Sequence, residues 1–289
     1  MSWRTVVISN RCKLDYKMGY LVVRGEDTKR ILLDEISTVI IESTAVSLTT
    51  YLIAEMTAKK IKVVICDNKR NPTAEVFSLY GSHDCSSKLK KQLQWDAEIK
   101  SMVWTEIVSE KIRKQMGFLF DLGYEAEAAM LYSYLVELEF NDITNREGHA
   151  AKVYFNALFG KGFTRSDDNV TNAALNYGYS LILSAVNREI VAQGYTTQLG
   201  LFHDNMFNPF NLSCDLMEPF RVTVDRFVYD RGYTEFDTKE KHDIVELMTT
   251  SVMINETNQL LSNAIKIYSH SVFDALNDRD VSLLKFYSV

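Results

Sequence analysis

The first eighty or so residues contain short runs in which apolar and polar positions alternate with a period of about two, the pattern of half-buried β-strands. These runs are rich in β-branched residues and span residues 6–9, 19–23, 37–41 and 62–66. Gly19 and the polar segment 67–72 supply turns between them. One helical pattern interrupts the series at 47–60. Residues 1–82 are therefore predicted to form a small, sandwich-like β-sheet domain with a single helix.

From about residue 86 onward, apolar residues recur with the helical period of about 3.6, as at Leu89, Leu93 and Ile99. Strand-like alternation is no longer visible. The predicted helices are 86–116, 125–140, 146–159, 168–193, 216–230, 239–268 and 270–285. The pattern changes near residues 80–83, where Gly and Ser interrupt it. We therefore predict an α+β fold whose second, larger domain, residues 83–289, is all-helical.

The composition is that of an ordinary folded protein and excludes several classes. Of 289 residues, 46% are hydrophobic and 24% charged, with 12 Gly and 3 Pro, which argues against long disordered or collagen-like tracts. No stretch approaches the ~20 apolar residues of a membrane-spanning helix, and no secretory signal pattern opens the chain, so we expect a cytoplasmic protein. The cysteines lack Cys-x-x-Cys spacing, so neither a zinc knuckle nor a disulfide framework is expected.

Charge is distributed unevenly along the chain. The net charge is −6, but residues 1–115 hold 19 Lys and Arg against 14 Asp and Glu, whereas residues 116–289 hold 13 against 24. A polyanion such as DNA would therefore have to be bound by local groups of cations. The alternative is a simple difference in solvated surface between two domains.

One unusual acid lies at the start of the predicted helix 146–159. On a helix, Glu147 shares a face with Ala150, Ala151 and Tyr154, which are residues that a helix normally buries. A buried carboxylate must be paired, neutralised or bound to a metal ion. The alternative is an acid that is favoured at a helix N-terminus by the helix dipole.

A second polar group lies between residues 200 and 221. Asp215, Glu218 and Arg221 are three residues apart and can point to one side of a helix. Because of Pro219, this helix either begins close to Asp215 or is bent at the proline. His203 precedes them on a loop. Carboxylates with a neutral imidazole suit Mg²⁺ or Mn²⁺, although a lone histidine is more often a turn residue with satisfied hydrogen bonds.

Several cations are candidates for binding a phosphate backbone. Arg165 follows a glycine-containing loop, and further cations bracket the predicted helix 86–116. These further cations are Lys88, Lys90, Lys91, Lys111, Arg113 and Lys114. Such groups are also commonly no more than solvated surface.

Taken together, four blocks of sequence resemble the CRISPR adaptation integrase family, Cas-one. The blocks are Glu147-Gly148-x-Ala150-Ala151-x-x-Tyr154, Arg165-x-x-Asp168-x-x-Asn172-x-x-Leu175-Asn176-x-x-Tyr179, Leu199-Gly200-x-x-His203 and Leu212-x-x-Asp215-Leu216-x-Glu218-Pro219-x-Arg221. The resemblance covers nearly the whole chain, and its order and spacing make it specific. In length and in the Glu218-Pro219-Phe220-Arg221 segment, the chain looks most similar to members that accompany type II systems.

The resemblance implies a metal-dependent DNA integrase and endonuclease that inserts short foreign DNA fragments into a CRISPR array. A DNA 3′-hydroxyl would attack a phosphodiester, with Mg²⁺ or Mn²⁺ bound by Glu147, His203 and Glu218. Many relatives carry Asp in place of Glu218, which leaves open whether Asp215 is a further ligand or orients His203. The bracketing cations, Arg165 and Arg221 would contact DNA.

The resemblance also implies partners. It predicts a homodimer, with its contact in the domain 1–82, and a heterohexamer in which two such dimers flank a dimer of the small protein Cas-two. Two other functions remain possible from the residues alone. One is a general metal-dependent DNA nuclease, and the other is a non-enzymatic helical scaffold that binds DNA or protein.

Overall fold

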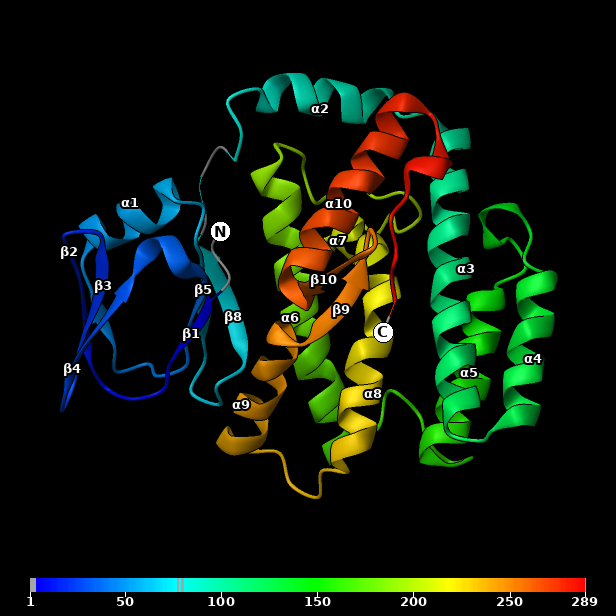
Figure 1. The fold of residues 1–289 in the computed structure, drawn as a ribbon, viewed down its shortest axis with the longest axis horizontal. Coiled ribbons are helices and arrows are strands. Elements are labelled where there is room, and N and C mark those ends of the chain that lie inside the picture. Colours follow the sequence, from blue (N-terminus) through cyan, green and yellow to red (C-terminus); the bar gives the residue numbers. More distant parts are fainter. Residues whose placement is uncertain (1–3, 77, 79–80, 289) are drawn as a thin grey trace. The chain divides into compact units, whose positions relative to one another are not determined.

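A computed structural model describes residues 4–76, 78 and 81–288. The chain divides into two compact units, Met1–Cys85 and Ser86–Val289 (Figure 1). The sequence pattern placed this change three residues earlier, between 82 and 83. Each unit has its own core, and the α+β class predicted from the sequence is confirmed, with a strand-rich first unit and a mostly helical second one.

The described residues of the first unit form two four-stranded sheets and one α-helix. One sheet has the order β1-β5-β7-β8, with β8 antiparallel to β7 and the other pairings parallel; the second has the order β4-β3-β2-β6. The strands are β1 (Arg4–Ile8), β2 (Lys13–Lys17), β3 (Tyr20–Arg24), β4 (Thr28–Leu32), β5 (Ile36–Ile41), β6 (Ser47–Leu48), β7 (Lys62–Cys66) and β8 (Pro72–Val76), and α1 is Thr50–Ala58. Apolar side chains of both sheets and of α1 form one buried cluster, as a sandwich requires.

Local sequence explains several of these elements. Met18 and Gly19 both have positive φ, 50° and 85°, which closes the tight β2–β3 hairpin. Thr49 caps α1, because its side chain accepts a hydrogen bond from the backbone N–H of Leu52. The sequence pattern missed β2, β4 and β8, which are more exposed and more polar than the predicted strands.

Helices dominate the second unit. Its α-helices are α2 (Cys85–Gln94), α3 (Ala97–Asp121), α4 (Glu125–Val136), α5 (Arg146–Phe159), α6 (Val170–Ala192), α7 (Asn211–Met217), α8 (Arg221–Arg231), α9 (Thr238–Glu246) and α10 (Leu261–Asp278). The predicted helix 86–116 is in fact two helices, because Asp96 caps α3 by accepting a hydrogen bond from Ile99 N–H. The predicted helix 216–230 likewise is divided into α7, a 3-10 turn (Glu218–Phe220) and α8.

The prediction that the second unit is all-helical is wrong. Three strands form a small antiparallel sheet in the order β10-β9-β11. They are β9 (Ser251–Ile254), β10 (Thr257–Leu260) and β11 (Tyr287–Ser288). Burial alternates along β9, and Asn255 and Glu256 have φ of 52° and 61°, which closes a hairpin within the predicted helix 239–268. The helix predicted at 270–285 instead begins earlier, as α10, and ends before β11.

Within residues 4–76, 78 and 81–288, no helix is both long enough and apolar enough to cross a membrane.

Candidate active site

The first predicted acid, Glu147, lies in the first turn of α5. The Asn145 side chain caps this helix by accepting from Gly148 N–H at 3.3 Å. The carboxylate of Asp142 accepts from the N–H groups of Arg146, at 2.6 Å, and Glu147, at 3.1 Å. Glu147 therefore lies at a helix N-terminus, where the helix dipole favours an acid. Its own carboxylate is not used for capping and points to a partner on α3.

Asp215 holds the loop that carries His203. This residue of α7 is 0% exposed, and its carboxylate accepts from the backbone N–H groups of Leu201 (2.6 Å), Phe202 (3.2 Å) and His203 (3.1 Å). It also contacts Nδ1 of the His203 ring at 2.6 Å. A β-carbon on Gly200 would lie 2.2 Å from the carbonyl oxygen of His203 and 2.8 Å from Asp215 Oδ2, so this close wrapping requires glycine. Both carboxylate oxygens are thus occupied, which favours an orienting role for Asp215 over that of a ligand.

Aromatic packing also holds the loop that carries His203. The Phe202 ring stacks on the buried Trp104 of α3 with ring centroids 4.7 Å apart and nearly parallel planes. The His203 ring meets Trp104 edge-on at 5.8 Å. The imidazole is therefore held by the hydrogen bond between Nδ1 and Asp215 and by a T-shaped contact with the Trp104 ring.

The hydrogen bond to Asp215 raises the pKa of His203, against the opposing effect of burial. In the neutral imidazole with the proton on Nδ1, that proton is donated to Asp215 and the lone pair of Nε2 is available to a metal ion. This is the tautomer that a histidine ligand bonded to a carboxylate adopts.

Glu218 lies where α7 passes into the 3-10 turn, and it is 3% exposed. Its Oε2 is 2.5 Å from Lys111 Nζ, and its Oε1 is 2.8 Å from Arg221 Nε. Burial alone would raise the pKa of Glu218, but Arg221 and Lys111 outweigh burial and lower this pKa to about 2. The carboxylate is therefore ionised at neutral pH.

Lys111 is not at the surface, where the sequence analysis placed it. It is 6% exposed, on α3, and its Nζ lies 2.5 Å from Glu147 Oε1 as well as 2.5 Å from Glu218 Oε2. Burial opposes the charged ammonium, but Glu218 and Glu147 together raise the pKa of Lys111. A single ammonium thus links the two acids that sequence analysis singled out separately.

One cavity of about 290 Å³ brings the predicted site residues together. It is lined by Lys111, Gln115, Glu147, Phe155, Arg165, Tyr179, His203, Glu218, Arg221 and Asp225. The structure therefore joins Glu147, His203 and Glu218, and it adds Gln115 and Asp225, which sequence reasoning missed. Asp225 lies four residues after Arg221, one helical turn along α8, and that spacing was the available signal.

Asp225 is fully buried beside the site. Its Oδ1 accepts a hydrogen bond from the Tyr179 hydroxyl. Burial raises the pKa of Asp225 to about 6, although the Tyr179 bond and the charge of Arg221 act in the opposite direction. Arg221 also lies over the Tyr179 ring, 4.7 Å from its centroid.

The chemistry of Glu147, Glu218 and His203 fits a divalent cation such as Mg²⁺ or Mn²⁺, which accepts carboxylate oxygens and a neutral imidazole nitrogen. Within the described part of the chain, no three His, Cys, Asp or Glu side chains are placed to hold a metal ion in the present conformation. The Lys111 ammonium lies between the two carboxylates. The acids already enclose a positive charge there, so their charge and direction suit a cation.

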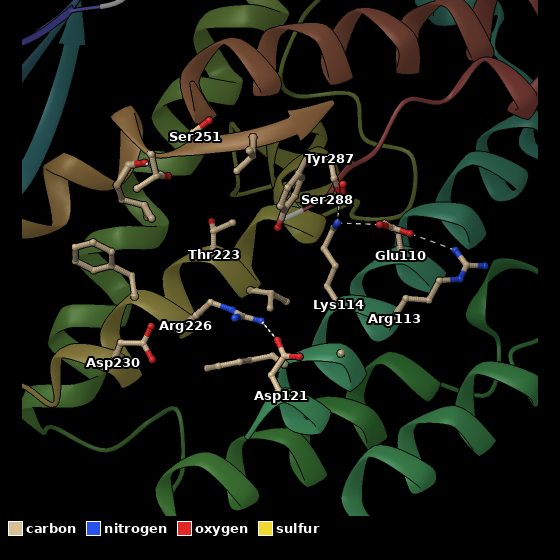
Figure 2. A pocket seen from close by; sticks show the side chains of 17 residues that line it. Glu110, Arg113, Lys114, Asp121, Thr223, Arg226, Asp230, Ser251, Tyr287 and Ser288 are labelled. Carbon is tan, nitrogen blue, oxygen red and sulfur yellow. Dashed lines mark hydrogen bonds and ion pairs between the residues drawn. The ribbon is translucent and has the colours of Figure 1, made fainter. Parts of the chain in front are cut away.

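The other predicted cations lie apart from this cavity. Arg113 and Lys114 line a second cavity of about 420 Å³, where both contact Glu110 (Figure 2). Lys114 also donates to the carbonyl oxygen of Tyr287 and lies 3.7 Å from the centroid of that ring. On α2, Lys88 lies over the Tyr195 ring at 5.4 Å, whereas Lys90 and Lys91 are exposed.

Tyr287, which lines the second cavity, also contacts the turn next to the candidate site. The Tyr287 hydroxyl donates to the carbonyl oxygen of Pro219 at 2.9 Å, and its ring stacks on Phe220 at 4.8 Å. Tyr287 thereby packs against the turn that carries Glu218.

Comparison with known proteins identifies the family of the chain. The model of a family described as CRISPR associated protein Cas1 matches residues 5–259. The CRISPR-associated endonuclease Cas1 of Neisseria meningitidis serogroup C is 31% identical over 291 residues, covering 99% of this chain and 96% of the relative. That of Francisella tularensis subsp. novicida is 24% identical over 237 residues, covering 74% of each chain.

Solved structures show the same fold. A casposase bound to an integration product has a TM-score of 0.78 at 18% identity, covering 97% of this chain and 92% of that chain. A Cas1 protein from Thermotoga maritima has a TM-score of 0.76 at 17% identity, with coverage of 94% and 97%. The fold is thus the one shared by casposases and Cas1 proteins. The chain belongs to the CRISPR-associated Cas1 family, as the four sequence blocks indicated.

Proposed function

We propose that this chain is a metal-dependent DNA integrase and endonuclease of CRISPR adaptation. It would insert short DNA fragments into a CRISPR array by attack of a 3′-hydroxyl on a phosphodiester. The observation that carries the proposal is the convergence of Glu147, His203 and Glu218 on one cavity of a Cas1-family chain. The names of its relatives, endonucleases and a casposase on an integration product, support the same chemistry.

Glu147, Glu218 and Nε2 of His203 would hold Mg²⁺ or Mn²⁺, and the bound ion would supply Lewis-acid polarisation of the phosphodiester and a lower pKa of the attacking hydroxyl. Asp215 keeps the imidazole oriented and its Nδ1 proton in place. Arg165 and Arg221 line the cavity and would bind non-bridging phosphate oxygens as charge builds up on them. Because the pKa of Glu218 is lowered, its carboxylate is ionised at neutral pH and can bind a cation.

The arginines are held in place before any substrate arrives. Arg165 donates to the side-chain oxygens of Asn172 and Asn176, the latter at 2.6 Å. Arg221 is fixed by Glu218 and by the Tyr179 ring. Fixed donors of this kind stabilise developing charge without reorganising during the reaction.

The partners in this proposal are double-stranded DNA, as fragment and array, a second copy of the chain, and Cas2. A structure with the same fold is named as a Cas6-RT-Cas1–Cas2 complex, of whose longer chain 36% is covered. The strand-rich domain 1–82 would form the homodimer contact, two dimers would flank a Cas2 dimer, and the assembly would work in the cytoplasm. Lys88, Lys90 and Lys91 would contact DNA outside the cavity.

A strand-joining assay tests the proposal. Purified protein, Cas2, a short duplex with free 3′-hydroxyls and an array plasmid are mixed with Mg²⁺ or Mn²⁺. Glu147→Gln, His203→Ala and Glu218→Gln should each abolish joining and leave DNA binding largely intact, whereas Asp204→Asn, an exposed neighbour of His203, should join normally. Normal joining by His203→Ala would refute the site.

The same assay separates the alternatives. A fragment with a blocked 3′-end cannot be joined, so cutting that is unaffected by the block, without any joining of the free fragment, would identify a general nuclease. A scaffold without enzymatic activity would bind no Mn²⁺ in calorimetry and would not respond to a chelator.

A further inference from the structure

The ammonium of Lys111 lies where the two proposed metal-binding carboxylates meet. Its Nζ is 2.5 Å from one oxygen of Glu147 and 2.5 Å from one oxygen of Glu218. The side chain is almost fully buried, on a 25-residue helix. A divalent ion that used both carboxylates would need the same space.

The charges of the neighbouring side chains also indicate that the ammonium stands in for a metal ion. Among the groups in direct contact, Glu147 and Glu218 carry two negative charges and Lys111 and Arg221 carry two positive ones, so this set of four is neutral without a metal ion. Without the ammonium, Arg221 would be the remaining cation in direct contact with these acids, an arrangement that burial of Glu218 makes unfavourable. With a divalent ion and both cations in place, the group carries two excess positive charges.

The structure also contains a second place for the ammonium. Gln115 follows Lys111 by one turn of α3, is 1% exposed and lines the same cavity. Its Oε1 is buried and has no hydrogen-bond partner within the described residues. Such an acceptor is unusual in a folded protein and suits an ammonium that leaves the carboxylates.

We propose that Lys111 is a resident counter-ion that holds Glu147 and Glu218 in place until a divalent metal ion displaces it toward Gln115. This inference rests on the proposed function, because it needs the metal ion at those two acids. It assigns to Lys111 a positioning role and not the DNA contact expected from the sequence. It also means that metal binding must work against an internal competitor.

One consequence is coupling between metal and DNA. The excess positive charge created by the metal ion would be neutralised by DNA phosphates, so each ligand should strengthen binding of the other. That part of the coupling which depends on Lys111 should disappear when the ammonium is removed.

The test measures Mn²⁺ binding to full-length, DNA-free protein by electron paramagnetic resonance of the free ion. Lys111→Met keeps the unbranched shape and most of the length of the side chain and removes its charge. It should bind Mn²⁺ at least about tenfold more tightly than the wild type. Lys100→Met, on the same helix and away from the cavity, should bind as the wild type does. Equal or weaker binding by Lys111→Met would overturn the proposal.

Gln115→Met provides a second, independent measurement. It should weaken Mn²⁺ binding several-fold in the wild-type background and have no effect in the Lys111→Met background, since no ammonium then needs an acceptor. Equal effects in both backgrounds would show that the ammonium does not move to Gln115 and would overturn that part of the proposal.

If circular dichroism shows that Lys111→Met does not fold, a measurement on the wild-type protein tests the displacement of Lys111 instead. The NMR signal of the buried Lys111 ammonium, identified by its absence in Lys111→Arg, should shift when Mg²⁺ binds, and an unchanged signal would refute displacement. Absence of Mn²⁺ binding by the wild type would overturn the metal site of the proposed function as well. Binding that needs Glu147 and is not tightened by Lys111→Met would overturn the counter-ion role alone.

Discussion

Replacing Asp215 by Asn changes one atom of the side chain and should disturb the whole His203 loop. The carboxylate accepts from three backbone N–H groups and contacts His203 Nδ1. An asparagine offers one acceptor oxygen and an NH₂ group that can only donate. At either orientation of the amide, the donors facing the NH₂ group lose their acceptor beside a side chain that is 0% exposed.

The magnitude follows from that count. Oδ1 and Oδ2 each serve two donors, so Asp215→Asn leaves about two buried or partly buried donors unsatisfied, at about 1–3 kcal/mol each. Loss of the buried charge also removes its desolvation penalty, which offsets part of the effect. We expect the free energy of unfolding of the second unit to fall by about 3 kcal/mol.

Urea unfolding followed by tryptophan fluorescence measures this loss, since Trp104 packs directly on Phe202 of the loop. Asp204→Asn, the exposed neighbour, is the control and should change stability by less than about 0.5 kcal/mol. Mn²⁺ affinity should also fall about 10–100-fold in Asp215→Asn, because the imidazole loses its orientation. A stability loss below about 1 kcal/mol with an unchanged urea dependence would show that the carboxylate does not hold the loop as described.

Three further predictions concern other parts of the site and surface. Asp225 binds a proton more tightly in the folded chain, where its pKa is about 6, than in the unfolded chain, so stability falls as pH rises from about 4 to 6. Asp225→Asn should therefore be more stable than the wild type by about 3 kcal/mol at pH 7.5 and equal to it near pH 4, and a difference independent of pH would contradict this. Gly200→Ala should weaken Mn²⁺ binding and cost about 2 kcal/mol of stability in urea titrations, whereas Gly162→Ala, which meets no atom within 4 Å, should change neither; equal effects would rule out the close packing at Gly200. Neutralising the α2 lysines should reduce the salt dependence of DNA affinity by up to about one unit of slope per phosphate contact, and an unchanged slope would assign them to plain solvated surface. These lysines are Lys88, Lys90 and Lys91.

Sequence patterns located the acids well because local rules govern the elements that carry them. The predicted helix 146–159 has the bounds of α5, since Asn145 and Asp142 cap its first turn. Both interpretations of Glu147 apply, because a residue in the first turn of a helix can still direct its carboxylate into a cavity. The apolar stripe on which Glu147 lies was the useful signal.

Other features could not be read from the chain because they depend on tertiary contacts. Lys111 belongs to a run of cations that also contains the more exposed Arg113, and spacing alone does not reveal which cation faces acids that lie 36 and 107 residues away. The hairpin of β9 and β10 was hidden within a helical pattern because its strands are only four residues long each. In such short strands, apolar spacing fits either period.

The contact between Gly178 and Val224 bears on how the protein could adapt to a substrate. A methyl group at Gly178 would come within 2.4 Å of Val224 Cγ1, so the backbone of α6 packs directly against a side chain of α8. Tyr179 and Arg221 are carried by this closely packed pair of helices. A larger side chain at Gly178 would push the two helices apart and move both residues in the cavity wall. Engineering the cavity for another polymer should therefore keep Gly178 and change the lining side chains instead.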